Sequence, residues 1–304
     1  MDATRRDGSR VVLKQVSASR YPDEARIGQL FSSEPLASHP SNRCIPIFDV
    51  LRVPNDDDTI ILVMPVLYRN EVPPFETIGE IVDFCRQVFE GLRFMHEHHV
   101  AHRDCKFNNI MADTARLYKS SPHPWATWLI DDASHQTQQL FSRTRKPVKY
   151  YFIDFGLSRI YSPEDGPPLE EEIWGGDKTV PEFRNCGDNI PLSDPFPVDV
   201  YFLGNTIRLQ WVDGEKSFTT AKKGLDFMRG LINDMVKPDP KSRPTMDEVV
   251  SRFENIVAGL STWKLRSRLV DVDERPARGV MRSIVHWAKH FGFMIRGIPA
   301  LPKL

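Results

Sequence analysis

Hydrophobic positions fall in short runs over the first quarter of the chain and at helical spacing further on. β-Branched residues crowd residues 10–16, and two apolar runs, residues 44–51 and 59–67, are separated by a polar turn at residues 54–58. Short apolar runs bounded by turn residues predict a strand followed by a strand pair. The first quarter is therefore expected to be rich in β-structure.

Helical spacing appears in three places. Pro22 opens a short predicted helix that Pro35 ends, and the last of the three covers residues 245–260. Between them, residues 78–95 carry apolar side chains at i, i+3, i+4 and i+7, which predicts a helix with one buried face. Strands first and helices later is the order of an α+β fold with a small β-rich lobe and a larger, mainly helical lobe.

Composition is that of an ordinary globular protein. Hydrophobic residues make up 40% and charged residues 27% of the 304 residues, enough chain for one two-lobed unit or two domains. The formal net charge of -1 gives no whole-protein attraction to nucleic acid or to an anionic membrane. No nucleic-acid partner is therefore expected.

The cysteines and the N-terminus bear on the cell compartment. The four cysteines lack metal-ligand or redox spacing, and Cys85 lies inside a helical pattern, so we expect reduced thiols and an intracellular, cytoplasmic protein. The first eight residues lack the apolar segment of a signal peptide. The sequence also has no uninterrupted run of about 18 apolar residues that would predict a membrane span.

Two polar motifs carry the chemistry. Residues 102–109 read H-R-D-C-K-F-N-N, and residues 154–156 read D-F-G. In this order they resemble the catalytic loop and the metal-binding turn of the eukaryotic protein kinases, and the unusual flanks are similar to divergent fungal members. The resemblance covers roughly residues 1–260. It implies a two-lobed kinase fold that transfers the γ-phosphate of ATP, with Mg²⁺, to hydroxyl groups.

The resemblance gives four residues a role at the reacting centre. Asp104 would accept the proton of the substrate hydroxyl. Lys106, the residue typical of serine/threonine kinases at this position, would contact the γ-phosphate. Asn109 and Asp154 would bind Mg²⁺ through oxygen atoms, the ligands that this hard cation prefers.

The resemblance also implies a nucleotide site. Lys14, at the end of Val-Val-Leu-Lys, would bind the α- and β-phosphates and would be held by a glutamate of the next helix. Glu24 is the favoured partner and Glu34 is its rival. Met64 would guard the back of the adenine pocket. Val66 and Leu67 would be the hinge residues that bind adenine.

Three further residues match structural positions of the kinase large lobe. Glu182, in Val-Pro-Glu, would pair with Arg243, and Asp199 would hold the backbone of the catalytic loop. Small-molecule kinases usually lack this set, so it favours a protein kinase. Arg103 precedes the catalytic aspartate, as in kinases switched by phosphorylation. The acidic run at residues 170–172 is either a substitute for phosphate opposite Arg103 or a solvated charge run, and the solvated run is favoured.

The chain departs from the kinase pattern in three places. About thirty residues, 114–147, are inserted before Asp154, and a surface excursion anchored by Trp125 and Trp128 is favoured over a docking element. Residues 174–179 lack the usual G-T-x-x-Y, with Gly175 at the substrate-orienting position, which affects peptide specificity more than phosphoryl transfer. The glycine-rich loop that covers the phosphates is missing before Lys14.

The missing loop leaves two interpretations open. The chain is either an incomplete product of a longer gene, which is favoured because the core chemical residues remain, or a weak or inactive kinase. A protein serine/threonine kinase is therefore predicted, with a pseudokinase acting as an interaction scaffold as the alternative. We expect ATP and Mg²⁺ as ligands, protein substrates of unknown identity and a monomer.

The last residues, 261–304, form a basic tail with nine Lys and Arg against three Asp and Glu. The apolar residues that would line one helical face are Val280, Met281, Ile284, Ala288 and Phe291. A helix packed on the large lobe, or a partly disordered tail, is favoured over a helix on a membrane surface. The expected boundaries are an N-lobe at residues 1–64, a hinge at residues 65–70 and a C-lobe at residues 71–260.

Overall fold

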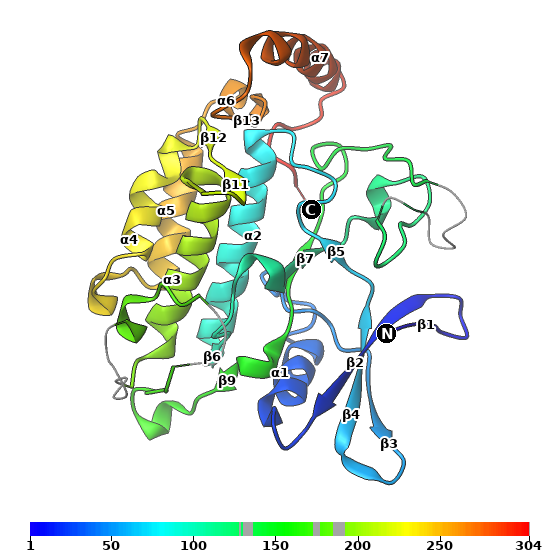
Figure 1. Ribbon diagram of the computed structural model, residues 1–304, viewed down its shortest axis with the longest axis vertical. Helices are drawn as coiled ribbons and strands as arrows, with labels where there is room; N and C mark the ends of the chain where they lie inside the picture. Colours follow the sequence, from blue (N-terminus) through cyan, green and yellow to red (C-terminus); the bar gives the residue numbers. More distant parts are fainter. Residues whose placement is uncertain (128, 130–135, 173–176, 185–191, 304) are drawn as a thin grey trace.

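The computed structural model describes residues 1–127, 129, 136–172, 177–184 and 192–303. A small lobe with a β-sheet and one helix lies at the bottom of Figure 1, and a larger, mainly helical lobe lies above it. The predicted two-lobed α+β fold is confirmed.

A four-stranded antiparallel sheet forms most of the small lobe. Its order is β1 (Asp2–Thr4), β2 (Arg10–Ser17), β4 (Asp56–Pro65) and β3 (Asp49–Val53). The predicted strand over residues 10–16 is confirmed as β2. Gly8, at φ +85°, closes the turn between β1 and β2, a conformation that suits a residue without a Cβ.

The predicted strand pair is only partly right. Asn55 takes the left-handed conformation at φ 61°, which asparagine tolerates, so the turn is complete by Asp56, where β4 already begins. The first residues of the run at 44–51 do not join this sheet. Instead, Cys44 makes a single parallel bridge with Phe152 of the large lobe.

Helix α1 (Pro22–Ser32) packs beside the sheet and buries Ile27 and Phe31. Proline at its first position suits the helix start because that N–H has no partner in the helix. The helix ends at Ser32, three residues before the predicted stop at Pro35, and Ser33 is already extended. Pro35 has no N–H that could continue the helix by bonding to the Phe31 carbonyl.

Helix α2 (Ile78–Glu97) runs through the large lobe and is buried along most of its length. Thr77 caps it by accepting a hydrogen bond from the Glu80 backbone at 3.1 Å. Its buried face packs against α5 (Met246–Ala258), which starts with a capping box of Thr245 and Glu248. Both helices are confirmed within a few residues of the predicted ends.

Short elements complete the large lobe. A three-stranded sheet has the order β5 (Tyr68–Arg69), β7 (Ile110–Ala112), β8 (Tyr150–Phe152). Three two-stranded pairs are β6 (Val100–Ala101) with β9 (Arg159–Ile160), β10 (Gly214–Glu215) with β11 (Thr219–Thr220), and β12 (Lys222–Lys223) with β13 (Val270–Asp271). The remaining helices are α3 (Pro195–Ile207), followed by a π-helical turn (Arg208–Val212), α4 (Arg229–Met235), α6 (Thr262–Arg266) and α7 (Pro276–Ile295).

The inserted segment is anchored differently from the prediction. Trp125 is 68% exposed, and Trp128 lies outside the described residues. The buried anchors are Arg143, which donates to the backbone oxygens of Asn70 and Pro73, and Thr144, which donates to Glu80. Arg143 and Thr144 are buried because their polar groups find acceptors inside the lobe, whereas the Trp125 side chain stays largely in solvent.

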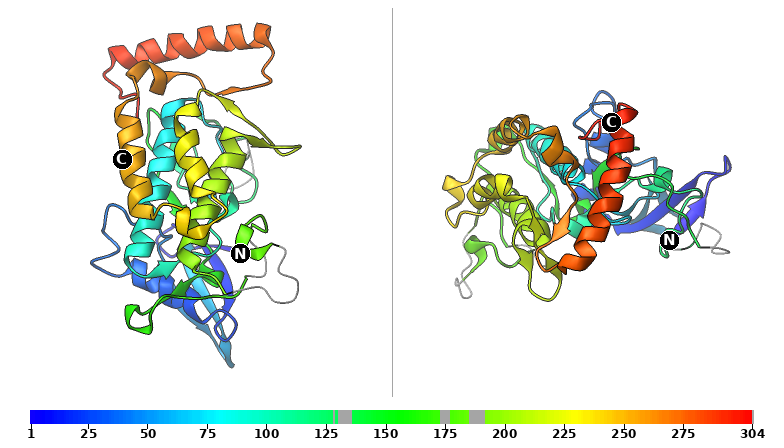
Figure 2. Two further views of the ribbon diagram at one scale, coloured as in Figure 1. Left: turned by 90° about the vertical axis from the view of Figure 1, so that its left-hand side faces the viewer. Right: turned by 90° about the horizontal axis from the view of Figure 1, so that it is seen from above.

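Helix α7 crosses the end of the large lobe that lies farthest from the small lobe (Figures 1 and 2). Within the described parts of the chain, none of the helices is long and apolar enough to cross a membrane. Three cysteines (Cys44, Cys85 and Cys105) are free and buried, and Cys186 lies outside the described residues.

Candidate active site

The two chemical motifs meet because of the hairpin of β7 and β8. Asn109 lies just before β7, and Asp154 follows β8, so the antiparallel pairing of these strands brings the two residues together across the inserted segment. The Ile153 backbone N–H donates to the Asn109 carbonyl at 2.9 Å. Helix α2 and β6 lead directly into the catalytic loop.

Asp104 is held by two neighbours of the same loop. Its Oδ2 accepts from Asn109 Nδ2 at 2.7 Å and lies 2.8 Å from Lys106 Nζ. Its Oδ1 is buried and receives no hydrogen bond from any described residue. Because a buried acceptor without a partner is costly, this oxygen is suited to an incoming hydroxyl group.

Asp199 of α3 holds the backbone of the catalytic loop through hydrogen bonds. Its carboxylate accepts from the backbone N–H groups of His102 and Arg103, each at 2.7 Å. Arg103 has φ 65°, a conformation that a non-glycine residue keeps only when its surroundings hold it. The predicted role of Asp199 is confirmed.

Ser158 was not predicted from the sequence. Its buried hydroxyl donates to the carbonyl oxygen of His102 at 2.8 Å and ties the strand after Asp-Phe-Gly to the catalytic loop. Its place two residues after that motif was the only available signal.

Lys14 connects the two lobes. Its ammonium group contacts Glu24 Oε1 and lies 2.6 Å from Asp154 Oδ1. Glu24 is only 3% exposed, whereas the rival Glu34 lies beyond the end of α1 and accepts from Ser38. The structure therefore pairs Lys14 with Glu24.

Charge pairing sets the protonation of this cluster. Burial alone would lower the pKa of Lys14, but the charges of Glu24 and Asp154 outweigh it and raise that pKa. Burial would likewise raise the pKa of Asp154, and the hydrogen bond and charge of Lys14 outweigh it and lower that pKa. Lys14 therefore stays a cation beside an ionised Asp154.

Asp154 itself takes the left-handed conformation, with φ 65° and ψ 72°. Phe155 is buried next to it, with its ring 5.8 Å from that of His102. This turn places the Phe155 ring in the core and directs the Asp154 carboxylate toward Lys14.

The strand register positions Met64, which was predicted to guard the adenine pocket. Val12 of β2 lies opposite Met64 of β4, two residues from the Lys14–Leu62 pair. Val66 and Leu67 follow β4 and lead into β5. Pro65 has no backbone donor, but its carbonyl oxygen is retained.

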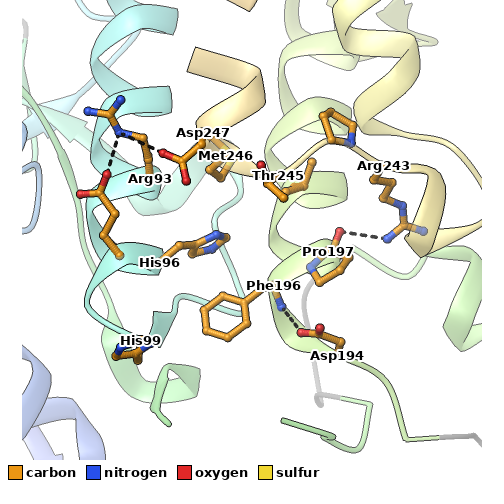
Figure 3. Close-up of a pocket in the computed structure, with 13 residues that line it drawn as sticks. Arg93, His96, His99, Asp194, Phe196, Pro197, Arg243, Thr245, Met246 and Asp247 are labelled. Carbon is orange, nitrogen blue, oxygen red and sulfur yellow. Dashed lines mark hydrogen bonds and ion pairs between the residues drawn. The ribbon is translucent and has the colours of Figure 1, made fainter. Parts of the chain in front are cut away.

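A pocket of about 340 Å³ lies elsewhere, between the end of α2 and the starts of α3 and α5 (Figure 3). His96, Asp194 and Arg243 are among the residues that line it, and Asp104, Asn109 and Asp154 are not. It is therefore separate from the chemical cluster.

Arg243 and Glu182 form a two-pronged ion pair. The Nη1–Oε1 and Nη2–Oε2 distances are 2.8 and 2.6 Å, and the Arg243 side chain is fully buried. Arg243 also donates to the carbonyl oxygens of Pro197 and Lys237. The Pro197 bond is visible in Figure 3. The predicted pair is confirmed.

The acidic run contacts Arg103, contrary to the favoured prediction. Arg103 Nη2 lies 3.2 Å from Glu170 Oε2 and donates to the Glu171 carbonyl at 3.2 Å. The Tyr161 hydroxyl also donates to Glu170, at 2.9 Å. A solvated charge run is therefore wrong for Glu170, because the buried guanidinium attracts its carboxylate. Gly175, the predicted substrate-orienting position, lies outside the described residues.

The chain belongs to the protein kinase domain family. The family model described as "Protein kinase domain" matches residues 2–171. The large-lobe pair of Arg243 and Glu182 lies beyond the matched segment and extends the kinase architecture toward α5.

Three curated relatives show how far this similarity extends. The "Light-sensor Protein kinase" of Ceratodon purpureus is 33% identical over 229 residues, 69% of this chain and 17% of that protein. The "Tyrosine-protein kinase receptor torso" of Bombyx mori is 21% identical over 198 residues, 65% of this chain and 22% of that protein. The "Probable serine/threonine-protein kinase MRK1 homolog" of Encephalitozoon cuniculi is 50% identical over 114 residues, 36% of this chain and 30% of that protein. The chain thus spans less than a third of each relative's length.

Proposed function

We propose that the chain is a protein serine/threonine kinase that transfers the γ-phosphate of Mg-ATP to hydroxyl groups of protein substrates. The observation that carries this proposal is the meeting of Lys14, Glu24 and Asp154 from three separate segments in one charged cluster. Membership of the protein kinase family supports it.

At the acceptor end, Asp104 orients the substrate hydroxyl and takes its proton through the oxygen that has no partner among the described residues. The hydroxyl oxygen forms a bond to the γ-phosphorus while the bond to the oxygen bridging the β- and γ-phosphorus breaks, and ADP leaves. Lys106, 2.8 Å from Asp104, adds positive charge beside the transferring group. Catalysis then rests on positioning and charge rather than on a covalent intermediate.

At the nucleotide end, Lys14 binds the α- and β-phosphates while Glu24 holds its ammonium group in place. Asn109 uses its amide nitrogen for both bonds to Asp104, which leaves its amide oxygen for a metal ligand. Together with the ionised Asp154, this oxygen fits Mg²⁺, which neutralises phosphate charge when it is bound. Met64 closes the back of the adenine site, and the backbone of Val66 and Leu67 binds the base.

Preference for serine and threonine is inferred from Lys106 and from the printed name of the Encephalitozoon relative. The Bombyx relative is named a tyrosine kinase, so acceptor type needs its own measurement. The free, buried Cys85 and Cys105 support a reducing compartment.

The test measures Mg-ATP binding by calorimetry and phosphorylation of a serine-, threonine- and tyrosine-containing peptide mixture. We expect binding and transfer to serine and threonine, loss of both with EDTA or in Asp154→Asn, and loss of transfer with retained binding in Asp104→Asn. Activity that appears only after a glycine-rich strand pair is added before residue 1 supports the proposed chemistry and shows that transfer needs a loop over the phosphates. ATP binding or transfer absent in both forms overturns the proposal.

A further inference from the structure

Helix α7 turns its apolar face away from the protein. Its exposed apolar side chains are between 51% and 87% accessible: Val280, Met281, Ile284, Val285, Phe291 and Ile295. Steps of four and seven residues keep most of these side chains on one side of a helix. A helix packed only for stability would bury this side.

The opposite face of α7 holds it to the large lobe. His286, His290 and Phe293 are its buried residues. His286 Nε2 lies 2.7 Å from the Arg266 carbonyl of α6, and Arg266 in turn donates to the Ile298 carbonyl at 2.5 Å. These contacts fix the rotation of the helix and keep its apolar side outward.

Positive charge lines one edge of the apolar face. The basic residues there are Arg278, Arg282, Lys289 and Arg296, and residues 275–304 contain no Asp or Glu. Arg282 and Lys289 pair with Glu274 and Glu76. Arg278 and Arg296 are 18 positions apart, five full turns or about 27 Å, so both project from the same side.

Aromatic rings line the other edge. Trp263 of α6 is 56% exposed, and its ring lies 5.4 Å from that of Trp287 and 6.1 Å from that of Phe291. Tryptophan favours the boundary between lipid headgroups and acyl chains, because its ring is apolar and its N–H is polar.

We propose that α7 binds the surface of an anionic lipid bilayer, lying in the plane of the interface with its apolar face in the lipid. An outward apolar face with a basic edge and an aromatic edge is the chemistry of an interfacial helix. A second copy of the chain fits less well, because it would bring two basic edges together without acidic residues on either helix. Because α7 lies at the end of the large lobe farthest from the small lobe, membrane contact through α7 would not involve the small lobe (Figure 1). The proposal does not depend on phosphoryl transfer.

The test is co-sedimentation of the full chain with vesicles of pure phosphatidylcholine and of phosphatidylcholine with about 30% phosphatidylserine, a content that gives the surface a negative potential. We expect binding to the anionic vesicles, little binding to the neutral ones, and weaker binding as salt rises because charge attraction is screened.

Two double variants separate the two contributions. Ile284→Ser with Phe291→Ser removes apolar contacts, and Arg278→Glu with Arg296→Glu reverses charge; each should weaken binding by about tenfold or more. The matched controls change exposed residues elsewhere, Phe218→Ser and Lys216→Glu, and should bind like the unchanged chain. Unchanged melting temperatures show that the variants are folded.

Three results overturn the proposal. The first is the absence of binding to both kinds of vesicle, and the second is equal binding by the unchanged chain and the folded α7 variants. The third is a concentration-dependent dimer in sedimentation velocity that Ile284→Ser with Phe291→Ser abolishes, without vesicle binding, since this would assign the apolar face to a second copy.

Discussion

The guanidinium group of Arg103 and the carboxylate of Glu170 lie 3.2 Å apart, beside the catalytic loop. Glu170 also accepts from the Tyr161 hydroxyl, and the Arg103 side chain is only 9% exposed. A carboxylate of the chain itself is thus paired with the arginine before Asp104 and links the segment after Asp-Phe-Gly to this loop. We predict that this charge does the work that a phosphate does in kinases switched by phosphorylation.

Activity should therefore be independent of phosphorylation. Treatment with a phosphatase should leave the rate of peptide phosphorylation unchanged, whereas Glu170→Ala should lower it about tenfold, because one charge-assisted hydrogen bond is worth about 1.5–3 kcal/mol. The measurement is the initial rate with and without phosphatase for both proteins.

Glu164→Ala is the matched control, because Glu164 is exposed in the same segment. Its rate should equal that of the unchanged chain. If phosphatase abolishes activity, or if both alanine variants behave alike, Glu170 does not replace a phosphate.

Nucleotide affinity should depend on the Lys14–Glu24 pair. Glu24→Gln keeps the shape of the side chain but removes the charge that holds the ammonium group, and Lys14→Met removes the ammonium group itself. Calorimetry should show ATP binding weakened about tenfold in each, since each loses one charge-assisted interaction. Glu34→Gln, which changes the rival glutamate, should bind ATP normally; equal losses in all three variants would contradict the assigned pair.

Much of the architecture could be predicted because its signals are local. The helix at residues 78–95 follows from repeated apolar spacing, and the catalytic loop from one contiguous motif. Asp199 and Arg243 could be assigned because each sits in its own recognisable sequence context. Their partners then followed from the family resemblance.

Contacts between segments that lie far apart in the sequence could not be predicted. No sequence pattern connects Glu170 with Arg103, which lies 67 positions earlier. The acidic run was therefore predicted to be solvated. Arg143 lies in the inserted segment, which was predicted to be a surface excursion, and its buried carbonyl acceptors come from residues about 70 positions earlier. The apolar face of α7 was visible in the sequence, but its outward rotation depends on burial of two residues that look polar, His286 and His290.

Stability should depend strongly on either member of the Arg243–Glu182 pair. The Arg243 side chain is fully buried and that of Glu182 is only 9% exposed, so removing one leaves the other charge without compensation and largely shielded from water. Arg243→Ala and Glu182→Ala should each lower the free energy of unfolding by about 3–5 kcal/mol. Urea denaturation followed by tryptophan fluorescence measures this change.

An exposed pair provides the comparison. Arg252 and Asp234 are also joined by an ion pair, but both side chains are at least 30% exposed. Arg252→Ala should cost no more than about 1 kcal/mol, because solvent screens exposed charges. Comparable losses for Arg243→Ala and Arg252→Ala would show that burial does not set the strength of the Glu182 contact.

The attachment of α7 should weaken in acid. Burial, together with the positive charges of neighbouring His286, Lys289 and Arg266, lowers the pKa of His290 to about 3, from an ordinary value of 6.5. In the unfolded chain His290 therefore takes up a proton below about pH 6.5, whereas in the folded chain it does so only near pH 3. This group's contribution to stability is thus complete above pH 6.5 and is lost as the pH falls toward 3.

His290→Leu removes the titrating ring from this buried position while keeping an apolar side chain. The melting temperature of the unchanged chain should fall more steeply between pH 7 and 4 than that of the variant, so that the two curves converge or cross in acid. His99→Asn alters an exposed histidine at φ 57°, a backbone conformation that asparagine accepts, and should keep the steeper profile. Parallel profiles for the unchanged chain and His290→Leu would mean that His290 takes up its proton in the folded protein near its ordinary pKa.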